Sequence, residues 1–362
     1  MGKLKKMSEK LFSRLYRRVR AEKFAFCPDL TQRMYSCPWS LGEDLEKNCR
    51  IFVVDSRRND VKYMERLKRD IIRCYYLYGT NTNEYFMHDM EHKRRADRET
   101  ILSKKLKDDY CLKAMHGSGP FAQLKDKWSF YQLTRRFFKR EVVVVDENTD
   151  RNALKYFLEK HPRFFAKPLE GTWGVGCFVG EYDPMEMNLL PEQFVSGRWI
   201  VEELIEQDER MSVWNATSIN TVRINSFRQK DGSFKILYPF IRMGRRGMVV
   251  DNAGCDGVYA SIDVETGRIC TDGFDETGNR FVQHPDVRVT FMNWQIPCWE
   301  DCIAYAKKVH AAMPLEHIYI GFDMALSTKG WMIVEGNWGD FICQQSSLRR
   351  GLKKEFKEAI EG

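Results

Sequence analysis

The pattern of apolar and polar positions divides the chain into a helix-rich first third and a mixed remainder. Before residue 118, apolar residues recur at helical spacing and predict helices over 61–78 and 94–112. The glycine-rich stretch 116–120 marks a joint, after which helical and strand-like periods alternate. The elements predicted beyond this joint are helices over 125–139, 152–159 and 299–312 and strands over 142–145, 199–205, 221–227 and 235–243.

The segment 321–337 predicts a β-hairpin, because two apolar runs flank a Ser-Thr-Lys-Gly turn. If the turn centres on its middle pair, Asp323 lies opposite Val334 or Glu335. Glu335 and Asn337 are two residues apart and therefore project from one face of their strand. Two carboxylates and an amide oxygen then converge, and such hard ligands suit Mg²⁺. The alternative is an exposed hairpin whose polar residues are incidental.

A lysine followed by a glycine-rich turn lies upstream and predicts a phosphate site. Lys167 ends an apolar strand, and glycines at 171, 174, 176 and 180 come next. Glycines let backbone N–H groups approach phosphate oxygens, and the lysine adds positive charge. No Gly-Lys-Ser/Thr ends the loop and a strand follows it, so the loop is neither a Walker A loop nor a dinucleotide fingerprint. The metal ion held by the hairpin would bind the same phosphates as this loop, so each motif supports the interpretation of the other.

These residues resemble the ATP-grasp superfamily, and within it the branch described as sugar-transfer-associated ATP-grasp. The resemblance runs from about Leu77 to about Ser347 and rests on five blocks in the family's order. The blocks are Asp126-Lys127 opening a helix, Lys167 with its glycine loop, the hinge 199–207, the stretch 218–224, and the Asp323/Glu335/Asn337 hairpin. The resemblance implies an α+β ATP-grasp fold in which two α+β lobes clamp ATP. The implied domains are a helix-rich region over 1–118, a first lobe over 119–206 and a second lobe over 207–362.

The resemblance also implies roles for individual residues around the nucleotide. Lys127 and Lys167 would bind phosphates from two sides. The remaining nucleotide-binding candidates are the closing loop Gly171, Thr172, Gly174 and Gly176 with Trp173 as its cap, the adenine hinge Glu202, Glu203 and Leu204, and a ribose contact from Glu206, Gln207 or Asp208.

For the reaction itself, the resemblance implies a metal site and catalytic cations. Asp323, Glu335 and Asn337 would hold Mg²⁺ or Mn²⁺. Arg223 and Arg242, together with Lys167, would stabilise the transferred phosphate and the acyl-phosphate intermediate. Many members carry an arginine just before the metal aspartate, whereas Gly321 and Phe322 stand there in this chain.

Several of these side chains also have ordinary structural interpretations. Lys127 could be a solvated helix lysine, and Arg223 could lie on the solvent face of a strand. Arg242, Arg245 and Arg246 could belong to a surface turn. Three further polar residues, each more often structural than functional in such positions, are His284, Gln344 and Gln345.

Composition is that of a folded globular protein. The chain has 362 residues, of which 43% are hydrophobic, which is enough for two or three subdomains. No apolar stretch reaches about 18 residues, so we predict no membrane-spanning helix, and the lysine-rich start predicts no secretory signal. The 11 cysteines include no C-x-x-C pair. We interpret them as buried free thiols of a cytoplasmic protein.

Positive charge is concentrated at the N-terminus. Through Lys23 nine Lys/Arg face two Glu, which gives +7, equal to the formal net charge of the whole chain. The balanced remainder argues against nucleic acid as the main partner. The segment also carries Leu4, Met7, Leu11, Leu15 and Val19 at helical spacing. It could lie on the inner, anionic membrane surface, pack on the protein's own body, or be a frayed terminus.

The resulting functional hypothesis is an ATP- and Mg-dependent carboxylate–amine ligase that forms an amide through an acyl-phosphate. The expected substrates are a small-molecule or glycan-precursor carboxylate and an amine, such as an amino acid, in polysaccharide biosynthesis. A small-molecule kinase and a non-catalytic nucleotide-binding protein are the alternatives.

Overall fold

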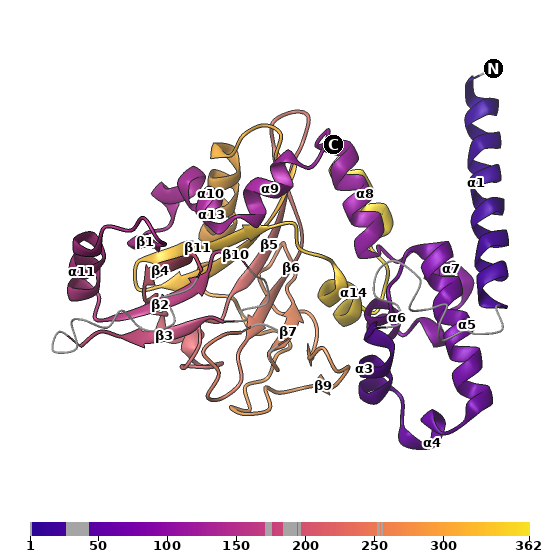
Figure 1. Cartoon of the computed structure of the whole chain (residues 1–362), viewed down its shortest axis with the longest axis horizontal. Coiled ribbons are helices and arrows are strands. Elements are labelled where there is room, and N and C mark those ends of the chain that lie inside the picture. The colour runs from indigo at the N-terminus through magenta and orange to yellow at the C-terminus, as the bar shows by residue number, and fades with distance from the viewer. Residues whose placement is uncertain are drawn as a thin grey trace. The chain divides into compact units, whose positions relative to one another are not determined.

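The computed structural model describes residues 2–26, 43–170, 176–183, 194, 197–251, 254 and 256–362 (Figure 1), except for the side chains of 2–12, 43 and 151. The chain divides into two units. Unit 1 joins Met1–Cys111 with Asp340–Glu358, and unit 2 joins Leu112–Gly339 with Ala359–Gly362.

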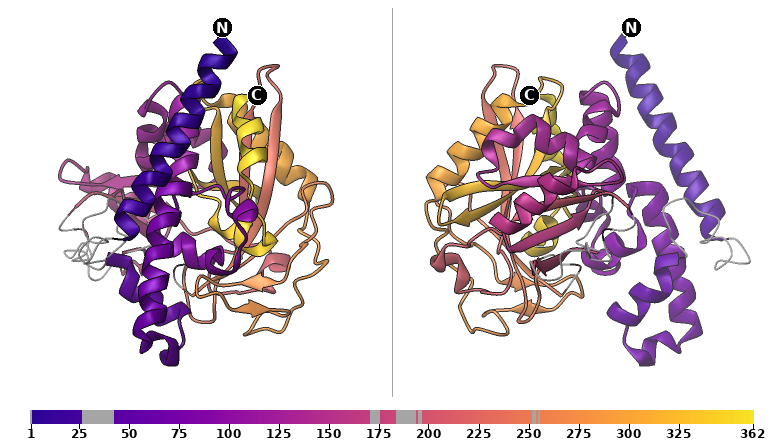
Figure 2. Two further views of the ribbon diagram at one scale, coloured as in Figure 1. Left: turned by 90° about the vertical axis from the view of Figure 1, so that its right-hand side faces the viewer. Right: turned by 60° about the vertical axis from the view of Figure 1, so that its left-hand side comes forward.

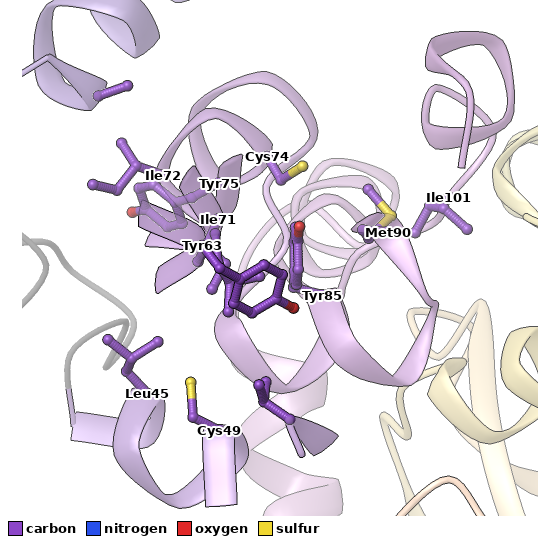
Figure 3. Close-up of a cluster of buried hydrophobic side chains, with 13 residues drawn as sticks. Leu45, Cys49, Tyr63, Ile71, Ile72, Cys74, Tyr75, Tyr85, Met90 and Ile101 are labelled. Carbon is purple, nitrogen blue, oxygen red and sulfur yellow. The ribbon is translucent and has the colours of Figure 1, made fainter. Parts of the chain in front are cut away.

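Unit 1 is built from helices, as the periodicity predicts. Its described helices are α1 (Gly2–Ala25), α3 (Glu43–Phe52), α4 (Asp55–Arg58), α5 (Val61–Tyr78), α6 (Thr82–Met87), η1 (Met90–His92), α7 (Arg95–Arg98), α8 (Lys104–Ala114), α14 (Ile342–Leu348) and α15 (Lys353–Glu361). Figure 3 shows the apolar cluster that these helices enclose, with side chains from α3, α5 and α6 pointing toward one another.

Helix α5 illustrates how the sequence sets a helix in place. The Asp60 side chain caps it by accepting hydrogen bonds from the backbone N–H groups of Lys62 and Tyr63 at 2.9 and 3.1 Å. Gly79 ends it in the left-handed conformation, with φ of 78°. Between these caps most of its buried residues are spaced three or four apart, which turns one face to the core: Tyr63, Leu67, Ile71, Cys74 and Tyr75, with Ile72 beside them.

The single helix predicted over 94–112 is wrong, because the chain breaks between α7 and α8. At the break, the side chain of Gln345 in α14 accepts from the N–H of Leu102 at 2.8 Å and donates to its carbonyl at 2.9 Å. Ser103 accepts a hydrogen bond from the N–H of Leu106 and so starts α8. A partner 243 residues away therefore interrupts the helical pattern.

Unit 2 contains two antiparallel sheets. The first has the order β1-β4-β2-β3 and comprises β1 (Val142–Val145), β4 (Trp199–Glu203), β2 (Arg163–Pro168) and β3 (Phe178–Glu181). Helix α11 (Arg151–Lys160) packs on it through Leu154, Phe157 and Leu158. Before β1 the chain forms α9 (Gly119–Lys125), α10 (Lys127–Thr134) and η2 (Arg135–Phe137). The helix predicted over 125–139 is therefore shorter and is capped by Asp126.

The second sheet has the order β11-β10-β5-β6-β7-β8-β9. Its strands are β5 (Val222–Arg228), β6 (Phe234–Met243), β7 (Val258–Ser261), β8 (Gly273–Phe274), β9 (Arg280–Phe281), β10 (Tyr319–Ser327) and β11 (Gly330–Asn337). Helix α12 (Glu209–Ser212) precedes it, and α13 (Trp299–Ala312) contacts β5, β10 and β11. Figure 1 shows the yellow β10–β11 hairpin beside β5.

The α+β fold class with a helical N-terminal region is confirmed. The strand over 142–145 and the helix over 299–312 have the predicted bounds, and the other predicted strands are shifted by one or two residues. The lobe boundaries 119–206 and 207–362 stay a prediction. Within the described residues, no helix combines the length and apolar character needed to cross a bilayer.

The cysteines are only partly as predicted. Those at 49, 74, 111 and 302 are buried free thiols, whereas Cys270 and Cys298 are exposed.

A buried carboxylate in unit 1 predicts a pH-dependent stability. Glu84 completes a capping box with Asn81 and also accepts from the backbone N–H of Lys104 at 2.5 Å. Burial raises its pKa to about 7, with a smaller contribution from the charge of Asp340. The folded state therefore binds this proton more tightly than the unfolded chain does. Stability from this group is complete below about pH 4.5 and is lost as the pH rises to 7, by about 3 kcal/mol.

We predict that Glu84→Gln flattens this fall in unfolding free energy between pH 4.5 and 7. Urea denaturation followed by far-ultraviolet circular dichroism at several pH values measures it. Glu46→Gln, which changes an exposed glutamate of the same unit, should keep the wild-type slope. An unchanged slope in Glu84→Gln contradicts the assignment.

Candidate functional site

The β10–β11 hairpin turns at Thr328 and Lys329, as predicted, since Ser327 pairs with Gly330. The register then shifts: Met324 pairs with Ile333, but Asp323 pairs with Glu335. Val334 is therefore the extra residue of a β-bulge. The bulge decides between the two pairings that the sequence left open, and it sets the carboxylates of Asp323 and Glu335 opposite each other.

Asp323 is buried between two arginines from neighbouring strands. Its side chain is 1% exposed, and it accepts from Arg223 Nε and, at 2.9 Å, from Arg223 Nη2. Arg242 Nη2 lies 2.9 Å from Asp323 Oδ2. Burial disfavours the charged carboxylate, but the two guanidinium groups outweigh it and hold the pKa of Asp323 well below its usual range. The site thus contains a permanently ionised aspartate with both oxygens engaged.

Arg223 lies beside Gly321, one of the two residues that stand where the ATP-grasp pattern has an arginine. A Cβ atom placed on Gly321 would lie 3.4 Å from Arg223 Cδ. The room beside Gly321 is therefore filled by an arginine of β5 rather than by one on β10 itself. The interpretation of Arg223 as a solvent-facing strand residue is wrong, because its side chain is 9% exposed and paired with Asp323.

Glu335 and Asn337 have a different environment from Asp323. Burial raises the pKa of Glu335, and the nearby charge of Asp323 raises it further while that of Lys167 opposes the rise. Asn337 Nδ2 donates to Glu335 Oε1 at 3.3 Å. Asn337 Oδ1 is buried and has no hydrogen-bond partner among the described residues.

This donor set fits a hard divalent cation. A cation beside Glu335 would relieve its repulsion from Asp323, and the orphaned amide oxygen of Asn337 would gain a partner. Across the described part of the chain, no three Asp, Glu, His or Cys side chains group in a way suited to a metal. The set is instead two carboxylates and one amide, and its role as a metal site stays a prediction.

The two predicted phosphate-binding lysines lie near this hairpin. Lys167 is buried in β2, with Nζ 2.6 Å from Glu202 Oε1. Lys127 opens α10 and donates to the carbonyls of Pro168 and Leu169 at 2.9 and 3.3 Å. Burial lowers the pKa of Lys127, whereas the charge of Glu335 raises it. Lys127 is thus not a solvated helix lysine. It is half-buried, and its ammonium group interacts electrostatically with the carboxylate of Glu335.

The predicted adenine hinge lies at the end of β4. Glu202 pairs with Val142 on one side and Phe165 on the other, and the N–H of Glu203 donates to the Glu141 carbonyl at 2.9 Å. Backbone groups within such ladders are already hydrogen-bonded. Of the three candidates only Leu204 lies beyond the strand, and their role as an adenine hinge stays a prediction.

Two of the three predicted ribose-binding side chains already form hydrogen bonds or an ion pair within the protein. The Gln207 side chain donates to Ser212 Oγ and to two backbone carbonyls, and it accepts from the N–H of Asn220 at 2.6 Å. Asp208 caps α12 and pairs with Arg210 at 2.7 Å. Glu206, more exposed, accepts from Thr328 Oγ1 at 3.2 Å.

The remaining predicted residues fall into two groups, those outside the described residues and those with other surroundings. Gly171, Thr172, Trp173 and Gly174 lie outside the described residues. Gly176 has a φ of 80°, which favours glycine. Three further side chains have partners elsewhere: Arg245 pairs with Asp286, His284 packs against Trp214 and Phe291, and Gln345 binds the backbone of Leu102 in unit 1. Gln344 is buried in unit 1, and its side-chain amide has no hydrogen-bond partner among the described residues.

Sequence reasoning missed Arg140, whose side chain is 1% exposed. Its Nη2 lies 2.8 Å from Glu202 Oε2, and its Nη1 and Nη2 donate to the carbonyls of Ile333 and Val334 at 2.5 and 3.3 Å. Arg140 therefore joins the first sheet to the bulge of β11. Only its position two residues before β1 could have drawn attention to it.

Gly339→Ala should destabilise the protein, because the new Cβ would lie 2.2 Å from Arg223 Nη1 and 3.0 Å from Asn337 Oδ1. That guanidinium is anchored on Asp323 and cannot swing away freely. We expect a loss of about 1–3 kcal/mol in urea denaturation. Gly119→Ala, whose Cβ meets nothing within 4 Å, is the control, and equal stability of the two variants contradicts the expectation.

Comparisons with known proteins place the chain in a family. No curated protein sequence matches the chain. Among solved structures, D-alanyl-alanine synthetase A from Vibrio cholerae is 12% identical with a TM-score of 0.41, and the match covers 68% of each chain. N5-carboxyaminoimidazole ribonucleotide synthetase from Thermotoga maritima is 12% identical with a TM-score of 0.39, over 66% of this chain and 49% of that one. This chain thus spans about half the length of the first solved structures it matches.

The model of the sugar-transfer associated ATP-grasp family matches residues 105–359, well over half of the chain, and this protein therefore belongs to that family.

Proposed function

We propose that this protein is an ATP-dependent carboxylate–amine ligase that forms an amide through an acyl-phosphate. The observation that carries the proposal is the convergence of Lys127, Lys167 and the Glu335/Asn337 pair on one site beside the arginine-bound Asp323. Cations on one side and hard oxygen ligands on the other are what a nucleotide triphosphate with a divalent ion requires. The ATP-grasp family to which the chain belongs binds ATP.

In the proposed reaction, the protein supplies positioning and charge. Mg²⁺ or Mn²⁺, held by Glu335, Asn337 and Asp323, would offset negative charge on the β- and γ-phosphates. Lys127 and Lys167 would neutralise the phosphate oxygens from the side of the first sheet. The substrate carboxylate oxygen attacks the γ-phosphorus and ADP leaves. The amine nitrogen then attacks the acyl carbon, phosphate leaves, and the nitrogen loses a proton.

Arg223 and Arg242 are the cations proposed to stabilise the developing oxyanion. Both are held by Asp323, so their positions are fixed before substrate binds. Preorganised charges need no rearrangement during the reaction, which is why a buried pair of this kind suits catalysis. Their proposed role does not require an arginine on β10.

The proposed substrates are a small-molecule or glycan-precursor carboxylate and an amine, in keeping with the family's association with sugar transfer. Nucleic acid is not among the proposed partners, because charge outside the N-terminal segment is balanced. We place the reaction in the cytoplasm, where ATP is abundant. The lobes over 119–206 and 207–362 remain the proposed walls of the nucleotide site.

Lys167→Ala and Glu335→Gln should each lower substrate-stimulated ADP release by about a hundredfold or more. Glu335→Gln should fold normally, since the amide has the shape of the carboxyl group and its oxygen can accept the hydrogen bond from Asn337 Nδ2. Lys155→Ala, which changes an exposed lysine of α11, is the control and should keep full activity. Chelation of divalent ions should also stop ADP release. Wild-type turnover in both site variants would remove the site assignment.

The reaction class is tested by incubating the wild-type protein with ATP, candidate amino acids or sugar acids, and hydroxylamine. A trapped hydroxamate supports the acyl-phosphate. A stable phosphoester with equal ADP release would instead make the protein a kinase. ADP release no higher than background with every acceptor would contradict both.

A further inference from the structure

Helix α1 has a stretch of eight consecutive exposed residues. Residues 13–20 are exposed on every side of the helix. The attachment to α5 comes later, through the fully buried Ala21 and Ala25 and through Glu22, which pairs with Arg73 at 3.0 Å. Figure 2 shows the N-terminal part of α1 extending past the end of α5. Residues 13–19 therefore stay exposed, whereas the guanidinium of Arg20 already lies over the ring of Tyr76 in α5, 5.4 Å from its centroid.

The exposed stretch is not uniformly polar. Leu15, Tyr16 and Val19 are 59%, 60% and 60% exposed. Leu15 and Val19 are four residues apart and lie on one face, roughly 120° away from the face that Ala21 and Ala25 bury. The apolar row is thus not the face that holds α1 to α5. Large apolar side chains gathered on a free helix face indicate a binding surface.

The arginines beside the apolar row indicate which class of partner fits this surface. Arg14, Arg17 and Arg18 flank the apolar row, and no carboxylate of the described residues forms an ion pair with any of them. The first 23 residues carry a net +7. A second copy of the helix would bring equal positive charge against it and be repelled. Nucleic acid would use the arginines but leave the apolar row in water. An anionic lipid surface takes both, with the apolar row at the acyl boundary and the arginines among the phosphates.

We propose that α1 docks the protein peripherally on anionic membrane surfaces through Leu15, Tyr16, Val19 and the surrounding arginines. This proposal is independent of the proposed ligase activity, since none of these residues belongs to the candidate site. It places the enzyme at a lipid surface rather than across it.

The test is co-sedimentation of the full-length protein with vesicles of phosphatidylcholine alone and of phosphatidylcholine with one quarter phosphatidylglycerol. We expect binding to the anionic vesicles only. Leu15→Asp with Val19→Asp should abolish it. Replacing Arg14, Arg17 and Arg18 by glutamine should weaken it about a hundredfold, since each basic residue near such a surface contributes about fivefold. The controls Val61→Asp and Arg94→Gln change exposed residues of the same unit and should bind like wild type.

Three results would overturn the proposal. One is equal binding of the wild type and the Leu15/Val19 variant. Another is wild-type self-association that the Leu15/Val19 variant loses. The third is tight, salt-sensitive binding to a 20-base-pair DNA duplex, with none to anionic vesicles.

A second inference rests on a different observation, the contacts of Arg140, and it depends on the proposed function. Glu202 has one oxygen on Lys167 and the other on Arg140. Arg140 in turn binds the carbonyls of Ile333 and Val334, directly before Glu335. A bulge leaves a backbone group outside the regular ladder, and Arg140 satisfies it. We infer that Arg140 is a positioning residue that sets Lys167 relative to Glu335.

Arg140→Met alone should destabilise the protein, because it leaves Glu202 with one partner fewer in a buried place. The decisive variant is Arg140→Lys, which keeps a cation beside Glu202 but lacks the planar fork that binds Glu202 and both carbonyls at once. If Arg140 positions the site, Arg140→Lys recovers stability relative to Arg140→Met but KM for ATP stays raised about tenfold. Recovery of both stability and KM would make Arg140 purely structural and contradict the inference. A wild-type protein that does not bind ATP would instead contradict the proposed function itself.

Discussion

The candidate site depends on a buried carboxylate that could not stay charged without its arginines. Asp323 lies on β10, Arg223 on β5 and Arg242 on β6, so one ion-pair cluster crosses three strands of the second sheet. Removing either arginine would leave charge in a place that water does not reach, which is far more costly than never having buried it. The cluster therefore fixes the strand side chains around Asp323, and through the hairpin register it fixes Glu335 as well. Positive charge is at the same time brought to the position where a reacting phosphate would need it.

The same requirement to pair buried charge links the two sheets of unit 2. Lys167, Glu202 and Arg140 form a line of alternating charges that ends on backbone carbonyls of β11. Each member neutralises the next, so none could be lost without exposing another. The β-bulge at Val334 is part of this line, because its carbonyl is one of the acceptors. The same contacts thus stabilise the protein and set the geometry of the candidate site.

Unit 1 has a different character. Its helices enclose an apolar core, and its polar buried residues, such as Glu84 and Gln345, hold helix starts and chain breaks rather than a site. The bare, basic stretch of α1 is the exception in this unit. A helix with exposed leucine, tyrosine and valine gains nothing from remaining in water, whereas an interfacial position would use both its apolar and its cationic side chains.

Local chemistry allowed the sequence to determine the elements and the kinds of groups involved. Turn residues and short-range periodicity predicted the hairpin at 321–337, the strand at 142–145 and the helix at 299–312, because each depends on neighbours a few residues away. The glycine loop and the three oxygen ligands pointed to a phosphate and a metal for the same reason. The tertiary structure decided what depends on distant partners: the bulge that pairs Asp323 with Glu335, the break before α8 and the role of Arg140. Arg140 reaches a carbonyl 194 residues away, and Arg223 pairs with a carboxylate 100 residues away. No local pattern encodes such contacts, since they form only when the strands and loops that carry them have already packed.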